Sequence, residues 1–423
     1  MPALARLMSV NMRIIIAGAG IAGLTTALSL HAAGLDALIV ESASELRPLG
    51  VGINVPPHAV RELTELGLGD ELAATGIETS EQAHFDRFGS LIWREPRGRG
   101  LGYRWPQYSI HRGELQMILL RAVQDRLGKD AVRTGTIVAS FDTRSVLLTD
   151  RSTGSSSREP FDALIGADGL YSAVRAQINP EEPPPRWSGV MLWRGIAEGE
   201  PFLSGASLTV SGSNAARKFV AYPVARTAGG RVMINWVAEA ALGGAGQAER
   251  ADWNRRGRIA DVLPWFSDWK FDWLDIPDLI IRSPEILEYP MVDRDPLPFW
   301  GRGRVTLAGD AAHPMYPIGS NGAAQAIIDA RVLAAELARC GGRAEQALAA
   351  YEDARRGPAN AIVLANRDMP ADRILHQVNL RAPEGFDRIE DVLSPGELRE
   401  INDAYRATTF PDVTALNNRP SYL

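Results

Sequence analysis

The chain has 423 residues, of which 45% are hydrophobic and 23% charged, a composition typical of a soluble globular protein with more than one folding unit. Its net charge of -6 excludes the broad basic surface of a nucleic-acid-binding protein. The single cysteine, Cys340, and six scattered histidines predict no disulfide framework and no metal site, and no apolar run is long enough to span a membrane, so we expect a cytoplasmic protein.

The first predicted elements are a strand, a glycine-rich turn and a helix. Residues 13–17 (RIIIA) form an unbroken apolar run, typical of a strand buried on both faces. GAGIAG (18–23) follows, and residues 22–33 have the pattern of a helix. A second strand at 36–40 ends at Glu41. These elements predict the first βαβ unit of a doubly wound α/β domain.

The glycine-rich turn has the spacing of a dinucleotide-binding loop. The first glycine permits a tight turn, the second lets the backbone approach a pyrophosphate, and the third lets the helix pack on the strand. Glu41 lies eighteen residues past Gly23, where it can accept hydrogen bonds from a ribose diol. The turn residues predicted to bind the dinucleotide are Gly18, Gly20, Ile21, Ala22 and Gly23.

Further along the chain, loops, helices and short strands alternate. The pattern predicts a loop at 48–57, a helical stretch at 58–74, short strands and turns at 84–108 and a helix at 112–127. A buried strand at 161–166 then leads into Asp168-Gly169.

The composition changes after the prolines at 183–185. Residues 186–300 hold eight of the ten tryptophans and several strand-like stretches, but no βαβ rhythm, which predicts a second domain made mainly of β-sheet. A buried strand returns at 304–309, followed by a long helix at about 321–338, and residues 344–423 are predicted to form helices and an extended tail.

Two later motifs extend the first one. LIGADGLYSAVR (164–175) and RVTLAGDAAHPMYPIGSNGAAQAIIDA (304–330) each place an aspartate beside a glycine just after a buried strand. With GAGIAG in this order, residues 12–365 resemble the flavoprotein aromatic hydroxylases, the p-hydroxybenzoate hydroxylase family of group A FAD monooxygenases. Stretches such as RPLGVGINVPPHAV and MLWRG resemble the branch of phenazine hydroxylases that act on 5-methylphenazine-1-carboxylate, with weaker similarity between 200 and 290.

The resemblance implies two interleaved domains. A doubly wound Rossmann-like FAD-binding domain is expected from three segments, 12–83, 109–183 and 301–345. A β-sheet-rich substrate domain is expected from strands at 84–108 together with residues 184–300. Residues 346–423 are left as C-terminal helices and tail, with no counterpart recognised beyond about 370.

The resemblance also implies the reaction. NADH or NADPH reduces FAD, and a flavin C4a-hydroperoxide formed with O₂ hydroxylates an aromatic or N-heteroaromatic, phenazine-like substrate, with or without loss of a ring carboxylate. The expected partners are that small substrate and O₂, and the chain is expected to be a monomer or a homodimer. Two alternatives stay open at this point: a flavin-dependent oxidase or dehydrogenase of similar fold, and a non-catalytic escort protein.

The family's cofactor-binding residues map onto the motifs. Asp168 and Gly169 are expected at the FAD pyrophosphate and the nicotinamide cofactor, and Gly309 and Asp310 at the ribityl chain. In the loop expected beside the isoalloxazine ring, Pro317 and Gly319 shape the backbone, and the N–H groups of the next three residues polarise the flavin. The remaining expected cofactor residues are Ser320, Asn321, Gly322, Ser42, Arg47 and Arg112.

The substrate pocket is expected on the β-sheet domain, where an aromatic side chain can stack on a planar ring. The expected catalytic residues are Pro317, Gly319, Asn321 and Tyr222. The expected pocket residues are Tyr222, Trp193, Trp236 and His84, with Arg194 and Arg217 as candidates for a substrate carboxylate. His313 is expected to orient the loop beside the isoalloxazine ring, residues 313–324, which is called the flavin loop below. No residue is identified as a general base.

Overall fold

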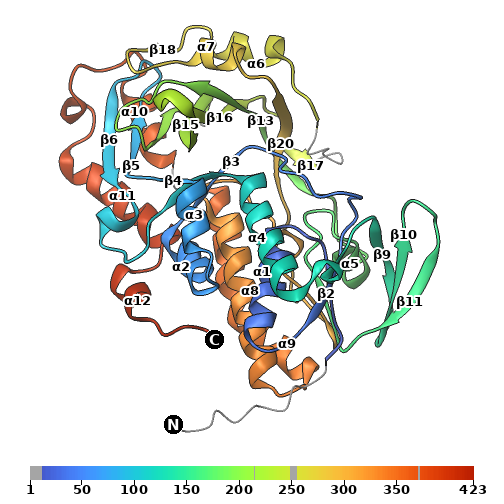
Figure 1. The fold of residues 1–423 in the computed structure, drawn as a ribbon. Coiled ribbons are helices and arrows are strands. Elements are labelled where there is room, and N and C mark those ends of the chain that lie inside the picture. The colour runs from blue at the N-terminus through green and yellow to red at the C-terminus, as the bar shows by residue number, and fades with distance from the viewer. Residues whose placement is uncertain (1–11, 214, 248–254, 370–371) are drawn as a thin grey trace.

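The computed structural model describes residues 12–213, 215–247, 255–369 and 372–423 (Figure 1). Two main sheets organise these residues: a parallel sheet in the lower half of Figure 1 and a larger mixed sheet above it. Among the residues described, no helix combines the length and the apolar surface needed to cross a bilayer.

The parallel sheet confirms the α/β fold predicted from the buried apolar runs. Its strand order, β21-β12-β1-β2-β8, places the three motif-bearing strands side by side. All side chains of the central strand are buried, because helices or strands cover both faces of the sheet. The five strands are β1 (Ile14–Ala17), β2 (Ala37–Val40), β8 (Val132–Arg133), β12 (Ala163–Gly166) and β21 (Val305–Leu307).

Helices cover one face of the parallel sheet. The predicted helical stretch at 58–74 is two helices, because Gly67 adopts a left-handed conformation (φ +75°) between them. On the other face, Figure 1 shows α5 (Ala173–Ile178) and an antiparallel sheet of β9 (Thr136–Phe141), β10 (Ser145–Asp150) and β11 (Ser156–Pro160). The covering helices are α1 (Ile21–Ala32), α2 (Pro57–Glu65), α3 (Gly69–Thr75), α4 (Arg112–Leu127), α8 (Asn321–Arg339) and α9 (Ala344–Arg367).

The large sheet has the order β17-β13-β16-β15-β14-β5-β6, and β20 pairs with β13. Its pairs are antiparallel except β14 with β5. The strands come from two separate parts of the chain: β5 (Glu81–Phe85), β6 (Leu91–Pro96), β13 (Arg186–Gly199), β14 (Ser207–Gly212), β15 (Arg217–Arg226), β16 (Val232–Ala241), β17 (Gly246–Gln247) and β20 (Ile286–Asp293).

The alternation of side chains gives the large sheet two distinct faces. The outer face packs its aromatic side chains under α6 (Ile259–Phe266) and α7 (Ile276–Ile281), with the hairpin β18 (Lys270–Phe271) and β19 (Leu274–Asp275) beside them. The inner face looks toward the parallel sheet. Between the two sheets lies a small sheet of β3 (Gly52–Val55), β7 (Tyr108–His111) and β4 (Ile77–Glu78) (Figure 1).

The C-terminal region wraps around both sheets. Helices α10 (Arg373–Arg381) and α11 (Pro395–Thr409) pack on the inner face of the large sheet, where Lys218 forms buried ion pairs with Asp372 (2.8 Å) and Glu239 (3.0 Å). After α12 (Val413–Asn418), the chain returns to α2. There the guanidinium group of Arg61 donates to the carbonyl oxygen of Leu416 at 2.9 Å.

Candidate functional site

The glycine-rich turn lies at the carboxyl end of the parallel sheet, between β1 and α1. A Cβ on Gly18 would lie 2.4 Å from the carbonyl oxygen of Ala167, and one on Gly23 would lie 1.9 Å from the carbonyl oxygen of Gly18. Both positions therefore require glycine. Gly20 differs, because a Cβ there would meet no atom within 4 Å. The backbone at Gly20 thus faces open space at the first turn of α1.

Two side chains, one that directly follows β2 and one from α4, fix the peptide groups of this turn. The carboxylate of Glu41 accepts hydrogen bonds from the backbone N–H groups of Ala19 and Ala43, both at 2.7 Å, and from the hydroxyl of the exposed Ser42 at 3.0 Å. The amide of Gln116 donates to the carbonyl oxygen of Ala19 at 2.8 Å. Gln116 was not among the predicted site residues, although it lies four residues beyond Arg112 on the same face of a helix.

The two aspartate–glycine motifs meet at the same edge of the sheet. The Asp168 carboxylate accepts from the Ser172 hydroxyl (2.5 Å) and the Ala173 N–H (2.7 Å) at the start of α5, and burial raises its pKa. Gly169 beside it has a φ of +79°. Arg175 of α5 then donates to the carbonyl oxygens of the residues that follow Asp310, Ala311 and Ala312, both at 2.9 Å. The Asp168-Gly169 motif, through Arg175, thus holds the Gly309-Asp310 motif in place.

A buried network of charged side chains also holds the Gly309-Asp310 motif in place. The carboxylate of Asp329, on α8, accepts from the Gly309 N–H (3.0 Å), from Nε2 of His313 (2.6 Å) and from Nε of Arg355 (2.8 Å). Burial alone would raise the pKa of Asp329, but His313 and Arg355 outweigh it and lower that pKa to about 2. His313 is therefore held by Asp329, a residue that was not among the predicted site residues.

The loop that follows the Gly309-Asp310 motif ends at the start of α8, where the backbone is unusual. Ser320 has a φ of +60°, a conformation that side chains other than glycine rarely adopt. Asn321 is 1% exposed, and neither polar atom of its side-chain amide has a partner among the described residues. Asp310 is exposed, and its Oδ1 lies 4.0 Å from where a Cβ on Gly322 would be.

The loop itself is anchored from α9. Nδ2 of Asn366 donates to the carbonyl oxygens of Tyr316 (3.2 Å) and Ile318 (3.3 Å). Between these two residues, Pro317 is exposed, and Gly319 follows with a φ of +69°. The backbone of the loop is therefore fixed while Pro317 projects away from the core.

These features fit FAD. The first turns of two helices, α1 and α8, lie close together at the site, since Gly309 is packed between them: a Cβ on Gly309 would lie 2.8 Å from Cβ of Ala22 on α1 and 3.2 Å from Cβ of Ala326 on α8. Among the described residues neither terminus has a side-chain cap, so their N–H groups remain available to the oxygens of a pyrophosphate or a flavin. The open space at Gly20 and the unpaired amide of Asn321 supply room and hydrogen-bond partners for such a group.

Two predicted arginines lie on the surface near these elements. Arg112 is exposed at the start of α4, and its backbone N–H donates to the carbonyl oxygen of Val51 at 2.8 Å. Arg47 is also exposed, and its guanidinium group pairs with Glu45 at 2.6 Å. The structure thus gives Arg47 a local partner and leaves its proposed contact with FAD without support.

The predicted substrate residues separate onto the two faces of the large sheet. Trp236 is fully buried on the outer face, where it stacks on Phe219 and donates to the Ser283 hydroxyl at 2.8 Å. Trp193 belongs to the same apolar cluster and donates to Glu288 at 2.8 Å. The prediction that both indoles line the pocket is corrected here, because α6 and α7 enclose them on the side away from the flavin loop.

The same alternation separates the charged candidates. Arg217 extends over Trp269 of the outer cluster and pairs with Asp268 at 3.0 Å, so the structure does not place it in a pocket with Arg194. Tyr222 and Arg194 lie on the inner face and bond to the same backbone carbonyl. His84, 2% exposed, pairs in register with Val210, which α10 covers.

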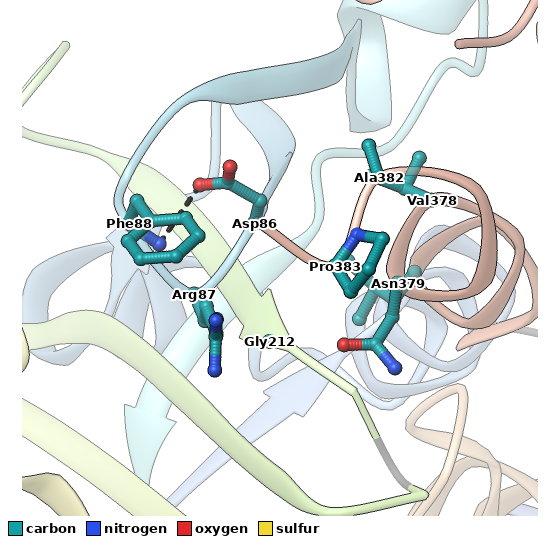
Figure 2. A pocket seen from close by; sticks show the side chains of 9 residues that line it. Asp86, Arg87, Phe88, Gly212, Val378, Asn379, Ala382 and Pro383 are labelled. Carbon is teal, nitrogen blue, oxygen red and sulfur yellow. Dashed lines mark hydrogen bonds between the residues drawn. The ribbon is translucent and has the colours of Figure 1, made fainter. Parts of the chain in front are cut away.

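A cavity at the end of the large sheet does not belong to this site. Figure 2 shows it between the β5–β6 turn, which carries Asp86 and Phe88, and the end of α10 at Pro383. Its volume is about 10 Å³, which is room for about one water molecule. None of its lining residues comes from the three motifs, so it is not a candidate for the substrate pocket.

Comparison with known proteins decides the family. The FAD binding domain family matches residues 11–251 and 295–366. The chain belongs to this family. It is 53% identical to the phenazine 1,6-dicarboxylic acid hydroxylase PhzS of Lysobacter antibioticus, over 84% of this chain and 89% of the relative. It is 32% identical to 3-hydroxybenzoate 6-hydroxylase 1 of Aquipseudomonas alcaligenes, over 77% and 80% of the two chains.

Solved structures agree with this result. Klebsiella pneumoniae HpxO complexed with FAD and uric acid superposes with a TM-score of 0.73 at 26% identity, covering 96% of this chain and 98% of HpxO. A salicylate hydroxylase substrate complex has the same fold, with a TM-score of 0.69 at 22% identity over 97% and 99% of the two chains. The member described here is an FAD-dependent aromatic-ring monooxygenase that uses NAD(P)H, as the resemblance implied.

Proposed function

We propose that this monooxygenase hydroxylates a carboxylated N-heteroaromatic compound of the phenazine type. The observation that carries the proposal is the 53% identity to a hydroxylase of phenazine 1,6-dicarboxylic acid, which extends over 363 residues. Arg194 places a positive charge on the inner face of the large sheet, which suits an anionic substrate. When bound, FAD supplies the redox chemistry that links NAD(P)H and O₂ to the ring.

The chain's own residues would bind and orient these groups. The first turns of α1 and α8 would offer N–H groups to the pyrophosphate and the flavin, and Glu41 would accept from the ribose. Asn321, buried and unpaired, would supply the polar contact at the flavin edge. Pro317, exposed at the flavin loop, and the inner face of the large sheet would enclose the reacting ring and exclude water.

A flavin-dependent oxidase of similar fold, one of the alternatives left open by the sequence, could hold its flavin covalently through a cysteine, and Cys340 is the single cysteine of the chain. Cys340 is buried at the end of α8, and the flavin loop leads into the start of that 19-residue helix. At 1.5 Å per residue, the two ends lie about 28 Å apart. Cys340 is therefore too far from the loop to hold the flavin, and we propose that FAD is bound without a covalent link through this thiol.

The test is the oxidation of NADH and NADPH by the purified protein, with and without phenazine, quinoline, pyridine and hydroxybenzoate carboxylates, under ¹⁸O₂. A phenazine carboxylate that accelerates oxidation and gains one labelled oxygen would support the proposal, and the product mass would reveal any loss of carboxylate. Acceleration without label identifies an uncoupling ligand or a dehydrogenase. A labelled product from hydroxybenzoate alone would replace the phenazine class.

We also propose that the protein is cytoplasmic and that it is a monomer or a homodimer.

A further inference from the structure

Three side chains of the large sheet converge on one residue of the small sheet. The N–H of Gly52 donates to Oδ1 of Asn235 at 2.7 Å, and its carbonyl oxygen accepts from the Tyr222 hydroxyl at 2.9 Å and from the Arg194 guanidinium group at 2.5 Å. The three side chains come from the neighbouring strands β16, β15 and β13, under which β3 lies in Figure 1. Both backbone polar groups of Gly52 are therefore held by the sheet.

The approach is so close that residue 52 must be glycine. A Cβ there would lie 2.7 Å from Cβ of Asn235 and 2.7 Å from Cγ1 of Val224, closer than real side chains come. The conformation of Gly52 is not the reason, since its φ is not positive. The requirement comes from the distance between β3 and the sheet, so the contact is a specific fit of two surfaces.

The side chains of this contact are buried and keep their hydrogen-bonding roles. Asn235 is fully buried and Tyr222 is 4% exposed. Burial raises the pKa of Tyr222 to about 12, so the phenol keeps its proton and donates it to the carbonyl at neutral pH. The Tyr289 hydroxyl, 3.1 Å from the Arg194 guanidinium group, orients that group from the neighbouring strand β20.

The segment that ends at Gly52 connects the sheet to the cofactor elements. A Cβ on Gly113, at the start of α4, would lie 2.4 Å from the backbone of Pro48, so the segment is packed tightly against that helix. The same helix fixes the glycine-rich turn through Gln116. On its other side, Val51 shares an apolar cluster with Tyr316 of the flavin loop. Residues 48–52 therefore touch elements on two sides of the proposed FAD site.

We propose that Arg194, Tyr222 and Asn235 are positioning residues that lock the segment 48–52 and so set the spacing between the substrate sheet and FAD. The inference rests on the proposed function in one respect only, that FAD lies against this segment. Tyr222 then acts through Gly52 rather than by stacking on the substrate, which replaces its predicted catalytic role.

The first test compares Tyr222→Phe with Tyr103→Phe. Both changes remove one hydroxyl that donates to a backbone carbonyl, at 2.9 Å to Gly52 and at 2.8 Å to Pro411, but Tyr103 lies away from the flavin elements. Hydrogen exchange of the peptide 48–55 in the flavin-free protein should become about two- to tenfold faster in Tyr222→Phe and stay unchanged in Tyr103→Phe. Equal exchange rates of this peptide in the two variants would overturn the proposal that Tyr222 locks the segment 48–52.

The second test uses the FAD-bound protein. In Tyr222→Phe we expect the yield of product per NAD(P)H to fall about two- to tenfold, while the dissociation constant of FAD stays within about twofold and the visible circular dichroism of the flavin changes. Unchanged coupling together with an unchanged flavin spectrum would reduce the contact to a purely structural one and overturn the positioning role.

A double-mutant cycle tests whether Tyr222 acts through Gly52. Gly52→Ala places a methyl group against Asn235 and Val224, so it should displace the segment and lower coupling by itself. Adding Tyr222→Phe should then lower coupling no further. If the loss of coupling in the double variant equals the product of the two single losses, the proposal that Tyr222 acts through Gly52 is refuted. If the wild-type protein hydroxylates no aromatic compound, the proposed function fails, but the exchange experiment and the flavin spectrum still decide the lock.

Discussion

Replacing Asp329 by asparagine tests how the Gly309-Asp310 motif is held at the proposed FAD site. The carboxylate is fully buried and accepts three hydrogen bonds, from the Gly309 N–H, His313 and Arg355. An asparagine carbonyl oxygen has the same position but no charge, and its NH₂ group donates where an acceptor is needed. The variant therefore leaves Arg355 as a buried cation without the carboxylate that it pairs with at 2.8 Å in the wild-type protein.

The structure sets the size of the effect. A pKa of about 2 against a reference of 3.8 corresponds to about 2 kcal/mol of stability at neutral pH. Because the pKa is lowered, this contribution is present above pH 4 and is lost as the pH falls toward 2. The unpaired cation adds to the cost, so we expect Asp329→Asn to lower the free energy of unfolding by about 3 kcal/mol. The weaker bond to Gly309 should reduce FAD affinity about tenfold.

The assay combines urea unfolding of the flavin-free protein at pH 7 and at pH 3, where part of the contribution of Asp329 is lost, with FAD titration at pH 7. Glu62→Gln is the matched control, since Glu62 is equally buried and pairs with Arg331 at 3.2 Å, but on α2 beside the C-terminal tail. It should lower stability without changing FAD affinity. A loss of stability below 1 kcal/mol in Asp329→Asn would refute the energetic argument, and wild-type FAD affinity would refute the link to the motif.

Three further predictions follow from the site and the core. Gly23→Ala should abolish FAD binding and destabilise the chain, because its Cβ would lie 1.9 Å from a carbonyl oxygen, whereas Gly20→Ala should keep the melting temperature of the flavin-free protein and lower only FAD affinity in a titration. Asp310→Ala should lower flavin occupancy, measured by absorbance at equal purity, without unfolding the protein, since this side chain is exposed; full occupancy would remove it from the site. Trp236→Ala should cost about 3 to 5 kcal/mol in urea unfolding while FAD affinity stays constant, and a change in affinity alone would contradict its place in the core.

The sequence predicted the parallel sheet well because the buried strands and their glycines are local signals. The run at 13–17, the turn at 18–23 and the helix at 112–127 each encode their structure within a few neighbours, and the structure has a strand, a turn and a helix there. The order of the three motifs also carried the cofactor correctly, since glycine spacing follows from the close approaches at Gly18 and Gly23.

The pocket side of the site could not be predicted in the same way. Which face of a strand is covered by helices depends on packing between distant segments, and a shift of one residue reverses the answer. Trp193 and Arg194 are neighbours in sequence but lie on opposite faces of β13. Asp329 and Gln116 were missed for a related reason, because their partners lie 16 to 97 residues away in the chain.

The C-terminal tail has a consequence for protein engineering. The family match ends at residue 366, yet beyond it Asp372 neutralises Lys218, and Arg419 pairs with the buried Glu62. Exchanging the tail for that of a relative would remove one of the two counter-ions of each charge, so that Lys218 would keep only Glu239 and Glu62 would keep only Arg331. A working chimera therefore has to carry the matching substitutions on β15 and α2, so the tail and the body must be transplanted as one unit.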